Sequence, residues 1–585
     1  MRDVTPVIRY PLDCSRVTFP RRMSTLLVLK LIAVGALMTS TANGAWGQSM
    51  TPPKIYTISP TGVNILDGAF TYSHVDLAIG PLKLERSHLG GPETTRAYFG
   101  ATWSHNWDMY VAVKLTGTVN VNTTVVIGRT KFHYLGQPST GAAPDNDAVG
   151  TSVTQGASGY IFTDRDGTRY NFGWDGVPRV TEIDYPNGSV VNISYANSLP
   201  KVISSNSGYA IVLDSNASGV VTAACGFNLT QSVVTTSTTC AGAALKVAYS
   251  YGSATWGTAL TGFTDARGNL TTISYATTTN KPAVACISLP NSATCRVTNA
   301  YDPNANFSQR VTQQTFADGS VWNFTTNGAY AGRDDQDPDT AVYSATMTAP
   351  DGGVTHFTFN GNGPTKITDP IGRPINSVYF GQFITSATLP EGNVVQYARN
   401  SRAVDAGYIW SAKPTTGLAD IYTSTKVFPS TCTNTITCNE PLSVTDANGN
   451  TTNYTYDPTH GGVLTETSPA NAAGVSAVIR HAYMQRYAWI ANGSGYVQAA
   501  SPAWLLSEDR TCRTSTTIGN ACAAGSADEV VTTYDYGPNS GPNNLLLRGK
   551  VITADGASLR SCFTYDWLGN KIAETTPRAG LVSCS

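Results

Sequence analysis

Residues 443–457 read SVTDANGNTTNYTYD, and this stretch decides the fold. Asp446 opens a turn that Gly449 completes, because an Asp carboxylate can bind turn amides and Gly adopts a positive φ without strain. After the turn, residues alternate up to Tyr454 and Tyr456 with the period of a β-strand. The stretch therefore predicts a hairpin of two short strands.

The same unit recurs along most of the chain. Asp351, Asp369 and Glu391 open three successive units, so the spacing is about 20 residues where nothing interrupts it. Each hairpin exposes an apolar face that only its neighbours can cover, so the units should stack. We predict an all-β fold in which tandem hairpins form one spiralling, curved sheet, a partial shell. The alternative is a sandwich of generic hairpins. Turn glycines of the units are Gly167, Gly188, Gly268, Gly319, Gly352, Gly372, Gly392, Gly449, Gly556 and Gly569.

Composition excludes several classes of protein. The chain has 585 residues, which is more than one hydrophobic core usually serves, so several domains or a repeat array are expected. Basic and acidic residues number 38 and 39, and this balance argues against a nucleic-acid partner. No apolar run is long enough for a transmembrane span.

Residues 1–47 have the features of a leader. Arg21 and Arg22 precede an apolar run that ends near Met38, and small residues such as Ala42 and Ala45 follow. A basic flank, a short apolar segment and small residues at the cleavage site are typical of a secretory signal peptide. We therefore expect a secreted or cell-surface protein; a short buried helix is the alternative.

The cysteines agree with export. Cys14 lies in the leader, and ten cysteines remain after its removal. None has the C-x-x-C spacing of zinc or redox sites. The simplest interpretation is five sequential disulfides, which persist in an oxidising compartment; ten unpaired buried thiols are the alternative. The expected couples are Cys225 with Cys240, Cys286 with Cys295, Cys432 with Cys438, Cys512 with Cys522, and Cys562 with Cys584.

Several stretches resemble the bacterial Rhs (rearrangement hotspot) family. The turn-and-aromatic unit resembles the YD repeat of that family, and the Tyr-Asp dipeptide itself occurs at residues 456–457, 534–535 and 565–566. Residues 80–87, GPLKLERS, and residues 99–107, FGATWSHNW, resemble two stretches of its N-terminal region. The second departs from the family pattern at Ala101 and Thr102.

The resemblance implies a β-sheet that winds into a hollow shell, which in this family often encloses a C-terminal toxin or other cargo. Full systems carry a longer repeat array, a segment that ends the shell and a variable effector. We find neither such a segment nor a separate effector before Ser585. The expectation is therefore a cargo encoded further on or elsewhere, or a shell-only protein.

Catalytic signatures are missing from the sequence. It contains no H-E-x-x-H, G-x-S-x-G, Walker A or dinucleotide motif, so we expect neither an enzyme nor a bound cofactor. His105 lies between Trp103 and Trp107, and we interpret it as a packed structural residue. Asp335, Asp337 and Asp339 offer calcium ligands, but Gly is missing at the sixth loop position of an EF-hand. A solvated loop is the preferred interpretation there.

We predict three regions: the leader at 1–47, an N-terminal β segment at 48–150, and the repeat array with insertions at 151–585. The insertion at 470–527 is expected to contain a short helix over 476–489. Our first functional hypothesis is an exported, non-catalytic scaffold that encloses a cargo or mediates cell contact. A surface adhesin for glycans or proteins is the second, because exposed aromatic rings can stack on sugars. A secreted polysaccharide-active enzyme is the third.

Overall fold

The computed structural model describes residues 52–88, 98–116, 120–174, 177–254, 257–277, 282–304, 309–327, 343–360 and 363–584. Pro52–Ser585 forms one compact unit. The predicted leader, together with Cys14, and the calcium candidates Asp335, Asp337 and Asp339 lie outside the described residues.

The described residues form an all-β structure, as predicted. They contain no α-helix, only the 3-10 turns η2 (Ser526–Asp528) and η3 (Pro577–Ala579), and hence no helix that could cross a membrane. The first strands are β1 (Tyr72–Ile79), β2 (Leu82–His88), β3 (Trp103–His105), β4 (Met109–Thr116), β5 (Asn120–Ile127), β6 (Thr130–Leu135), β7 (Ala143–Pro144), β8 (Ser152–Gly156), β9 (Gly159–Thr163), β10 (Arg169–Gly173), β11 (Arg179–Asp184), β12 (Val190–Ala196), β13 (Leu199–Ser205), β14 (Tyr209–Ser215), β15 (Val221–Asn228), β16 (Leu245–Ala254), β17 (Gly257–Thr264), β18 (Leu270–Tyr275), β19 (Val284–Ser288), β20 (Cys295–Tyr301), β21 (Val311–Phe316) and β22 (Val321–Asn327). The later strands are β23 (Tyr343–Thr348), β24 (Val354–Asn360), β25 (Gly363–Thr368), β26 (Pro374–Phe380), β27 (Phe383–Thr388), β28 (Val394–Arg399), β29 (Asp405–Trp410), β30 (Ile421–Val427), β31 (Ser443–Asp446), β32 (Thr451–Tyr456), β33 (Val463–Ala470), β34 (Ser476–Arg486), β35 (Trp489–Ala491), β36 (Tyr496–Gln498), β37 (Ala503–Cys512), β38 (Thr517–Ile518), β39 (Ala521–Cys522), β40 (Glu529–Asp535), β41 (Gly549–Ala554), β42 (Ala557–Tyr565) and β43 (Lys571–Glu574).

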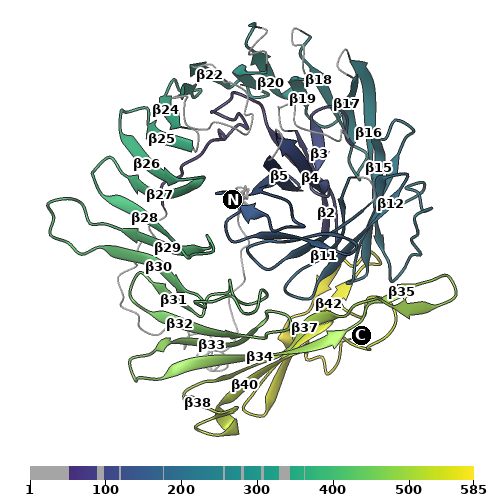
Figure 1. Ribbon diagram of the computed structural model, residues 1–585. Helices are drawn as coiled ribbons and strands as arrows, with labels where there is room; N and C mark the ends of the chain where they lie inside the picture. Colours follow the sequence, from purple (N-terminus) through teal and green to yellow (C-terminus); the bar gives the residue numbers. More distant parts are fainter. Residues whose placement is uncertain are drawn as a thin grey trace, which may run out of the picture. The chain divides into compact units, whose positions relative to one another are not determined.

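Most strands belong to one continuous antiparallel sheet (Figure 1). From β11 to β34 every strand pairs with the next strand in the chain, and the pairing then continues through β37, β40, β41 and β42 to β43. The hairpin of β4 and β5 joins this sheet through one pair of residues, Tyr110 and Arg179. Strands β1 to β3 form a separate sheet, and β35–β36 and β38–β39 form two small ribbons. This chain-order pairing is the outcome expected for tandem hairpins.

Nine of the ten repeat turns have the same backbone geometry, and the exception is the two-residue turn at Asp555 and Gly556, where both residues have a positive φ. In the turn between β31 and β32, the amide of Gly449 donates to the carbonyl of Asp446, and the amide of Asp446 donates to the carbonyl of Asn450. The Asp446 carboxylate accepts the amide protons of Asn448 and Asn450, each at 2.9 Å. Gly449 has φ of 82°, which disfavours any residue with a Cβ. The Asp-to-Gly spacing read from the sequence therefore reflects this turn.

A tyrosine closes the open end of many repeat hairpins. In the hairpin of β11 and β12, pairing is confined to the positions next to the turn, from Glu182 with Asn192 to Asp184 with Val190. Beyond these pairs the strands diverge, and the Tyr195 hydroxyl donates to the carbonyl of Val180 at 2.7 Å. Seven further tyrosines bond in the same way to a carbonyl in or just before the preceding strand of the sheet: Tyr251 to Val221, Tyr275 to Leu260, Tyr301 to Val284, Tyr456 to Pro441, Tyr483 to Val463, Tyr536 to Leu506 and Tyr565 to Leu547.

The same tyrosines coincide with β-bulges towards the next strand. Register shifts occur between Ser194 and Tyr195, between Ser274 and Tyr275, and between Thr455 and Tyr456. A bulge bends its strand and increases the local twist. The bulges that recur at these tyrosines therefore bend the sheet repeatedly along the chain.

The stretch 476–489 is not a helix, so this prediction was wrong. Residues Ser476–Arg486 form β34, which pairs with β33 on one side and with β37 on the other. Ala, Met, Gln and Arg in this stretch have good helix propensity, but hydrogen bonding on both edges outweighs so weak a preference.

Candidate functional site

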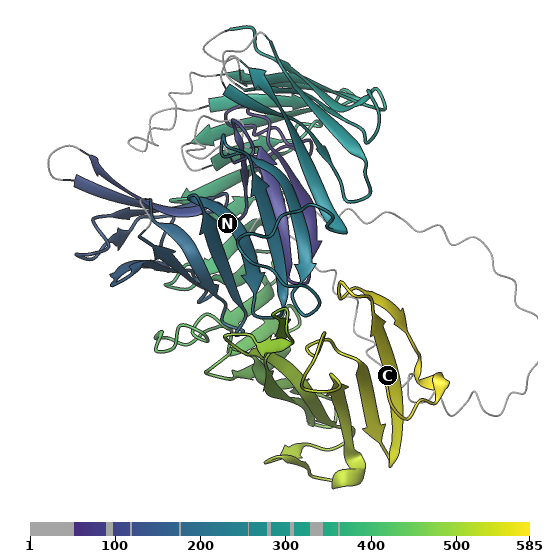
Figure 2. The same ribbon diagram turned by 90° about the vertical axis from the view of Figure 1, so that its right-hand side faces the viewer.

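The N-terminal segment lies on one face of the repeat sheet. We call this the aromatic face, because Tyr195, Tyr275 and Tyr301 lie on it. Strands β1 and β2 lie against β14, β15 and β16 (Figure 2). Trp103 donates its indole N–H to the Tyr275 hydroxyl at 2.8 Å, and Ala69 forms a β-bridge with Arg310. The described residues of 52–108, without 89–97, therefore share one core with the strands up to β25, and the buried members of this core run from Val63 to Ile367.

A buried ion pair lies at the centre of this core. Asp76 on β1 and Arg86 on β2 have fully buried side chains, and Arg86 Nε lies 2.8 Å from Asp76 Oδ2. The guanidinium also lies 4.8 Å from the ring centre of Trp103 and 4.5 Å from that of Phe263. Arg86 Nη2 donates a second hydrogen bond to Asp76 at 3.0 Å, and the Tyr249 hydroxyl donates a further one at 2.8 Å. These contacts compensate two charges that would otherwise be very costly to bury.

The charge state of the pair follows from its neighbours. Desolvation alone would raise the pKa of Asp76, but Arg86 and the hydrogen bond from His74 outweigh it, so the pKa is lowered. Burial raises the pKa of Tyr249 well above its usual value, and the nearby Asp76 raises it further. The cluster therefore holds one carboxylate and one guanidinium with a neutral phenol between the sheets.

Two histidines in the same core are neutral. Burial lowers the pKa of His88 and of His105 to about 3. The His105 ring packs against Tyr98 and Phe99, and its Nδ1 accepts the amide proton of Trp107 at 3.2 Å. His105 is thus a packed core residue. With 2% of its surface exposed, it has no access to a substrate in solution.

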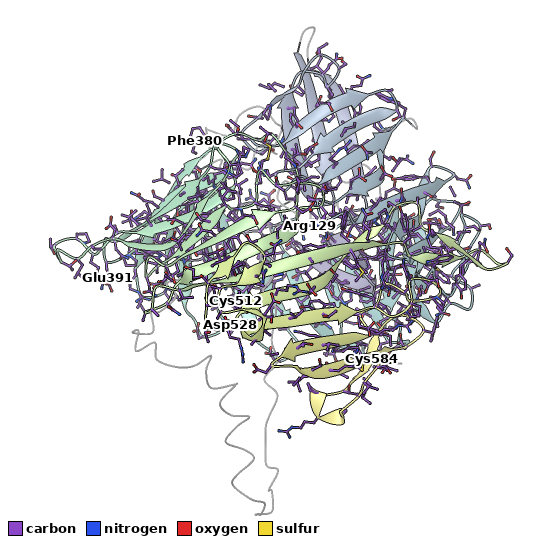
Figure 3. All side chains as sticks on the ribbon, turned by 90° about the horizontal axis from the view of Figure 1, so that it is seen from below. Arg129, Phe380, Glu391, Cys512, Asp528 and Cys584 are labelled. Carbon is purple, nitrogen blue, oxygen red and sulfur yellow. A yellow bond between two sulfur atoms is a disulfide. The ribbon has the colours of Figure 1, made fainter. Side chains whose placement is uncertain are left out.

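The ten cysteines are joined in the five expected couples: Cys225–Cys240, Cys286–Cys295, Cys432–Cys438, Cys512–Cys522 and Cys562–Cys584. Cys512 and Cys522 also lie close to Asp528, within the separation of metal ligands (Figure 3). Because both sulfurs are bonded to each other, they are not thiolate ligands. Hydrogen bonds from Ser515 and Thr514 lower the pKa of Asp528 to about 2, which identifies it as the acceptor that organises its loop.

Turns of the early strands rest on strands and loops far along the chain, and we call this contact the seam. Asn206 donates to the carbonyl of Pro502 at 2.9 Å, over a separation of 296 residues. Asn228 donates to Asn543 and to the carbonyl of Trp567. At Gly150 and Gly188 a Cβ would collide with the Arg402 carbonyl and the Trp504 ring, respectively. The early part of the sheet is therefore in contact with its late part, although many strands separate the two along the chain.

The aromatic face is covered less completely in the last strands. In β33 every residue except the last is half-buried, and β34 and β37 are similar. From β31 onward the buried apolar residues are Ala488, Ala499, Cys512, Cys522, Tyr536 and Cys562. Within the described residues, the lining that residues 52–108 supply to the early strands does not extend to these late strands.

Sequence reasoning singled out His105 and the cysteines but missed the pair of Asp76 and Arg86. Arg86 lies in the stretch 80–87 that we compared with the Rhs family. A charged residue amid alternating apolar residues, as Arg86 is after Leu82 and Leu84, was the available signal of a buried charge.

Comparison with known proteins gives one match to a family profile. A domain of unknown function, DUF6531, matches residues 61–126, which include the two stretches that resemble the Rhs family. No curated protein matches the chain.

Three solved structures illustrate the structural similarities. The alignment with a TcdB2-TccC3 complex without its hypervariable C-terminal region covers 84% of this chain and 26% of the TcdB2-TccC3 chain. The sequence identity is 9% and the TM-score is 0.34. The Photorhabdus luminescens Tc holotoxin pore aligns with 81% of this chain and 29% of that chain, at 11% identity and a TM-score of 0.29. A porin-like protein from Bacteroides uniformis aligns with 40% of this chain and 57% of that chain, at 13% identity and a TM-score of 0.13. The chain thus spans between a quarter and a third of the Tc chains it is similar to.

Proposed function

We propose that this protein is an exported, non-catalytic β-scaffold whose late strands present the aromatic face to a polypeptide cargo that the scaffold encloses. The observation that carries the proposal is the contrast along one sheet. The same repeat has its aromatic face covered by residues 52–108 in the early strands and left half-exposed in the late strands.

The distribution of titratable groups supports a non-catalytic role. The most strongly perturbed groups near the N-terminal segment, His88, His105 and Tyr249, are sealed in the core rather than gathered in a cleft. An enzyme needs such groups within reach of a bound substrate. Here burial of the same groups serves to join two sheets.

The five disulfides support export, because such bonds persist in an oxidising compartment outside the cytoplasm. We propose that residues 1–47 act as the signal peptide that takes the chain there.

Site-specific photo-crosslinking in the producing cell tests this function. Tyr454 and Phe563 lie on the aromatic face, and their chain neighbours Thr455 and Thr564 lie exposed on the opposite face. With a photoreactive phenylalanine at each position in turn, we expect Tyr454 and Phe563 to capture one polypeptide that Thr455 and Thr564 do not capture. That polypeptide should also resist added protease until the scaffold is cut. Equal capture from both faces, or a captured polypeptide that protease removes first, would refute enclosure.

A further inference from the structure

A pocket of about 620 Å³ opens on the face of β8 to β12 that is opposite the aromatic face. Gly159 and Gly173 form part of its lining, and Asn171, Glu182, Asp184 and Asn192 contribute polar side chains. Its volume is in the range of pockets that hold small ligands. We propose that this pocket binds a neutral oligosaccharide. The inference goes beyond the scaffold role, because the pocket lies away from the face assigned to the cargo.

The hollow arises from glycines on three neighbouring strands. Gly156 pairs with Gly159, and Gly159 pairs with Gly173, so β8, β9 and β10 have no side chain along this row. A Cβ at Gly159 would collide with the carbonyl of Phe172. The backbone is therefore bare at one end of the pocket, where a flat ring can approach closely.

The polar wall is organised by one amide. Asn171 Nδ2 lies 3.1 Å from Glu182 Oε1 and 3.1 Å from Asp184 Oδ2. Each carboxylate keeps its other oxygen as an acceptor, and the Asn171 amide oxygen remains an acceptor as well. All three side chains are half-buried, so their positions are restrained before any ligand arrives.

Donors stand beside these acceptors. Arg169 is directly paired with Asp184, and Asn192 is directly paired with Glu182, so their side chains lie on the same face. A sugar hydroxyl both donates and accepts a hydrogen bond, so it suits a wall in which the two functions alternate. Ile161, which is paired with Asn171 and lies on the same face, adds apolar surface for the ring C–H groups.

Other ligand classes fit this wall less well. Two carboxylates against one arginine disfavour an anion such as a phosphate. For a divalent cation, Glu182 and Asp184 lack a third acidic or histidine partner: among the described residues such a trio occurs around Cys512. Arg169 would also repel a cation. A neutral polyhydroxyl compound uses the donors and acceptors together.

Binding of defined sugars by the full exported chain tests the proposal. Maltohexaose, cellohexaose, xylohexaose and chitohexaose are the probes, measured by saturation-transfer NMR and titration calorimetry. We expect at least one to bind and Asp184→Asn and Asn192→Ala each to weaken it about ten-fold, as loss of a hydrogen bond to a charged or buried partner does.

The matched control is Asn323→Ala. Asn323 is an exposed amide on the hairpin of β21 and β22, outside the lining of this pocket, where it accepts a hydrogen bond from Gln313. The control should bind like the unchanged protein, and all variants should keep its melting temperature. Failure of all four sugars to bind, equal affinity in the pocket variants, or a response to calcium chloride in place of sugar would each overturn the proposal. The cross-linking result above is independent of these outcomes.

Discussion

The early and the late strands of this sheet are built from the same repeat but differ in what covers them. In β12 the apolar residues Val191 and Ile193 are buried in the core that the early strands share with the N-terminal segment. In β32 and β33, by contrast, most residues that face the same way are half-exposed. The turn with its aspartate, the short ladder and the tyrosine hydroxyl occur in both regions.

The comparison separates two sources of structure. Hydrogen bonds within each repeat determine the shape of a hairpin, since turn and tyrosine satisfy the backbone locally. Burial of the early strands, by contrast, depends on packing against the N-terminal segment, which is a different part of the chain. Because burial dominates stability, the early strands should be the more stable region and the late strands the more easily opened one.

The largest expected effect comes from breaking the ion pair under the early strands. Arg86→Ala leaves Asp76 buried without its partner, which should lower the free energy of unfolding by about 3–5 kcal/mol. Arg560→Ala is the matched change in the late strands, where Arg560 pairs with the partly exposed Asp535, and it should cost less than about 1 kcal/mol. Urea unfolding followed by circular dichroism measures both. Similar losses of unfolding free energy in the two variants would show that burial under the N-terminal segment does not cause the difference in stability between the two regions.

Lowering the pH should destabilise the early strands before it destabilises the late strands. His88 and His105 have a pKa of about 3 in the folded protein and about 6.5 when unfolded. Since the unfolded chain binds the protons more tightly, stability is complete above pH 6.5 and falls as the pH drops towards 3. At pH 5 the loss is about 2 kcal/mol per histidine.

Hydrogen exchange monitored by mass spectrometry, corrected for the intrinsic rate, measures this at pH 7 and pH 5. Protection should fall in β2, β3 and β16, and His105→Leu should flatten the pH dependence. If the difference in protection between the early and the late strands were the same at pH 5 as at pH 7, the conclusion that His88 and His105 are buried as neutral groups would be wrong.

Reduction of disulfides should loosen the late strands. The Cys562–Cys584 bond encloses 22 residues next to the end strand β43, and a loop of this size contributes about 3 kcal/mol. Replacing both cysteines by serine should open β42 and β43 to protease while β12 to β25 stay protected. Non-reducing peptide mapping of the unchanged protein should find all five sequential links; free thiols at these positions would contradict both the pairing and the export.

The smallest effect tests the repeat itself. Tyr195→Phe removes the donor to the carbonyl of Val180 and should cost about 1–2 kcal/mol, because this carbonyl lies under cover. Tyr456→Phe removes the same bond to Pro441 in the more open region and should cost about half as much. Thermal unfolding compares the two. Equal losses of stability in the two variants would mean that the tyrosine hydroxyl stabilises the fold equally in the covered and in the more open region.

Much of the fold could be predicted because its signals are local. The Asp-to-Gly spacing indicated the turns, the tyrosines indicated the strand ends, and each cysteine is bonded to its neighbour along the chain. The stretch 476–489 failed for the opposite reason, since its strand state depends on β37, which begins 17 residues after β34 ends.

Long-range features had no such signal. Asn206 and Pro502 meet only because the intervening strands curve by a defined amount, and no residue type announces that contact. The amide of Asn171 lies beside Glu182 because the register of β10 and β11 places the two residues opposite each other. Chemistry assembled in this way becomes visible only with coordinates.

The seam has a consequence for how such a chain can change in length. Inserting or deleting a single hairpin between Asn206 and Pro502 would move every later strand out of phase with the turns it rests on. Viable length variants should therefore add or remove whole circuits of the sheet, or change only its ends, so that evolution alters the size of the protein in discrete steps.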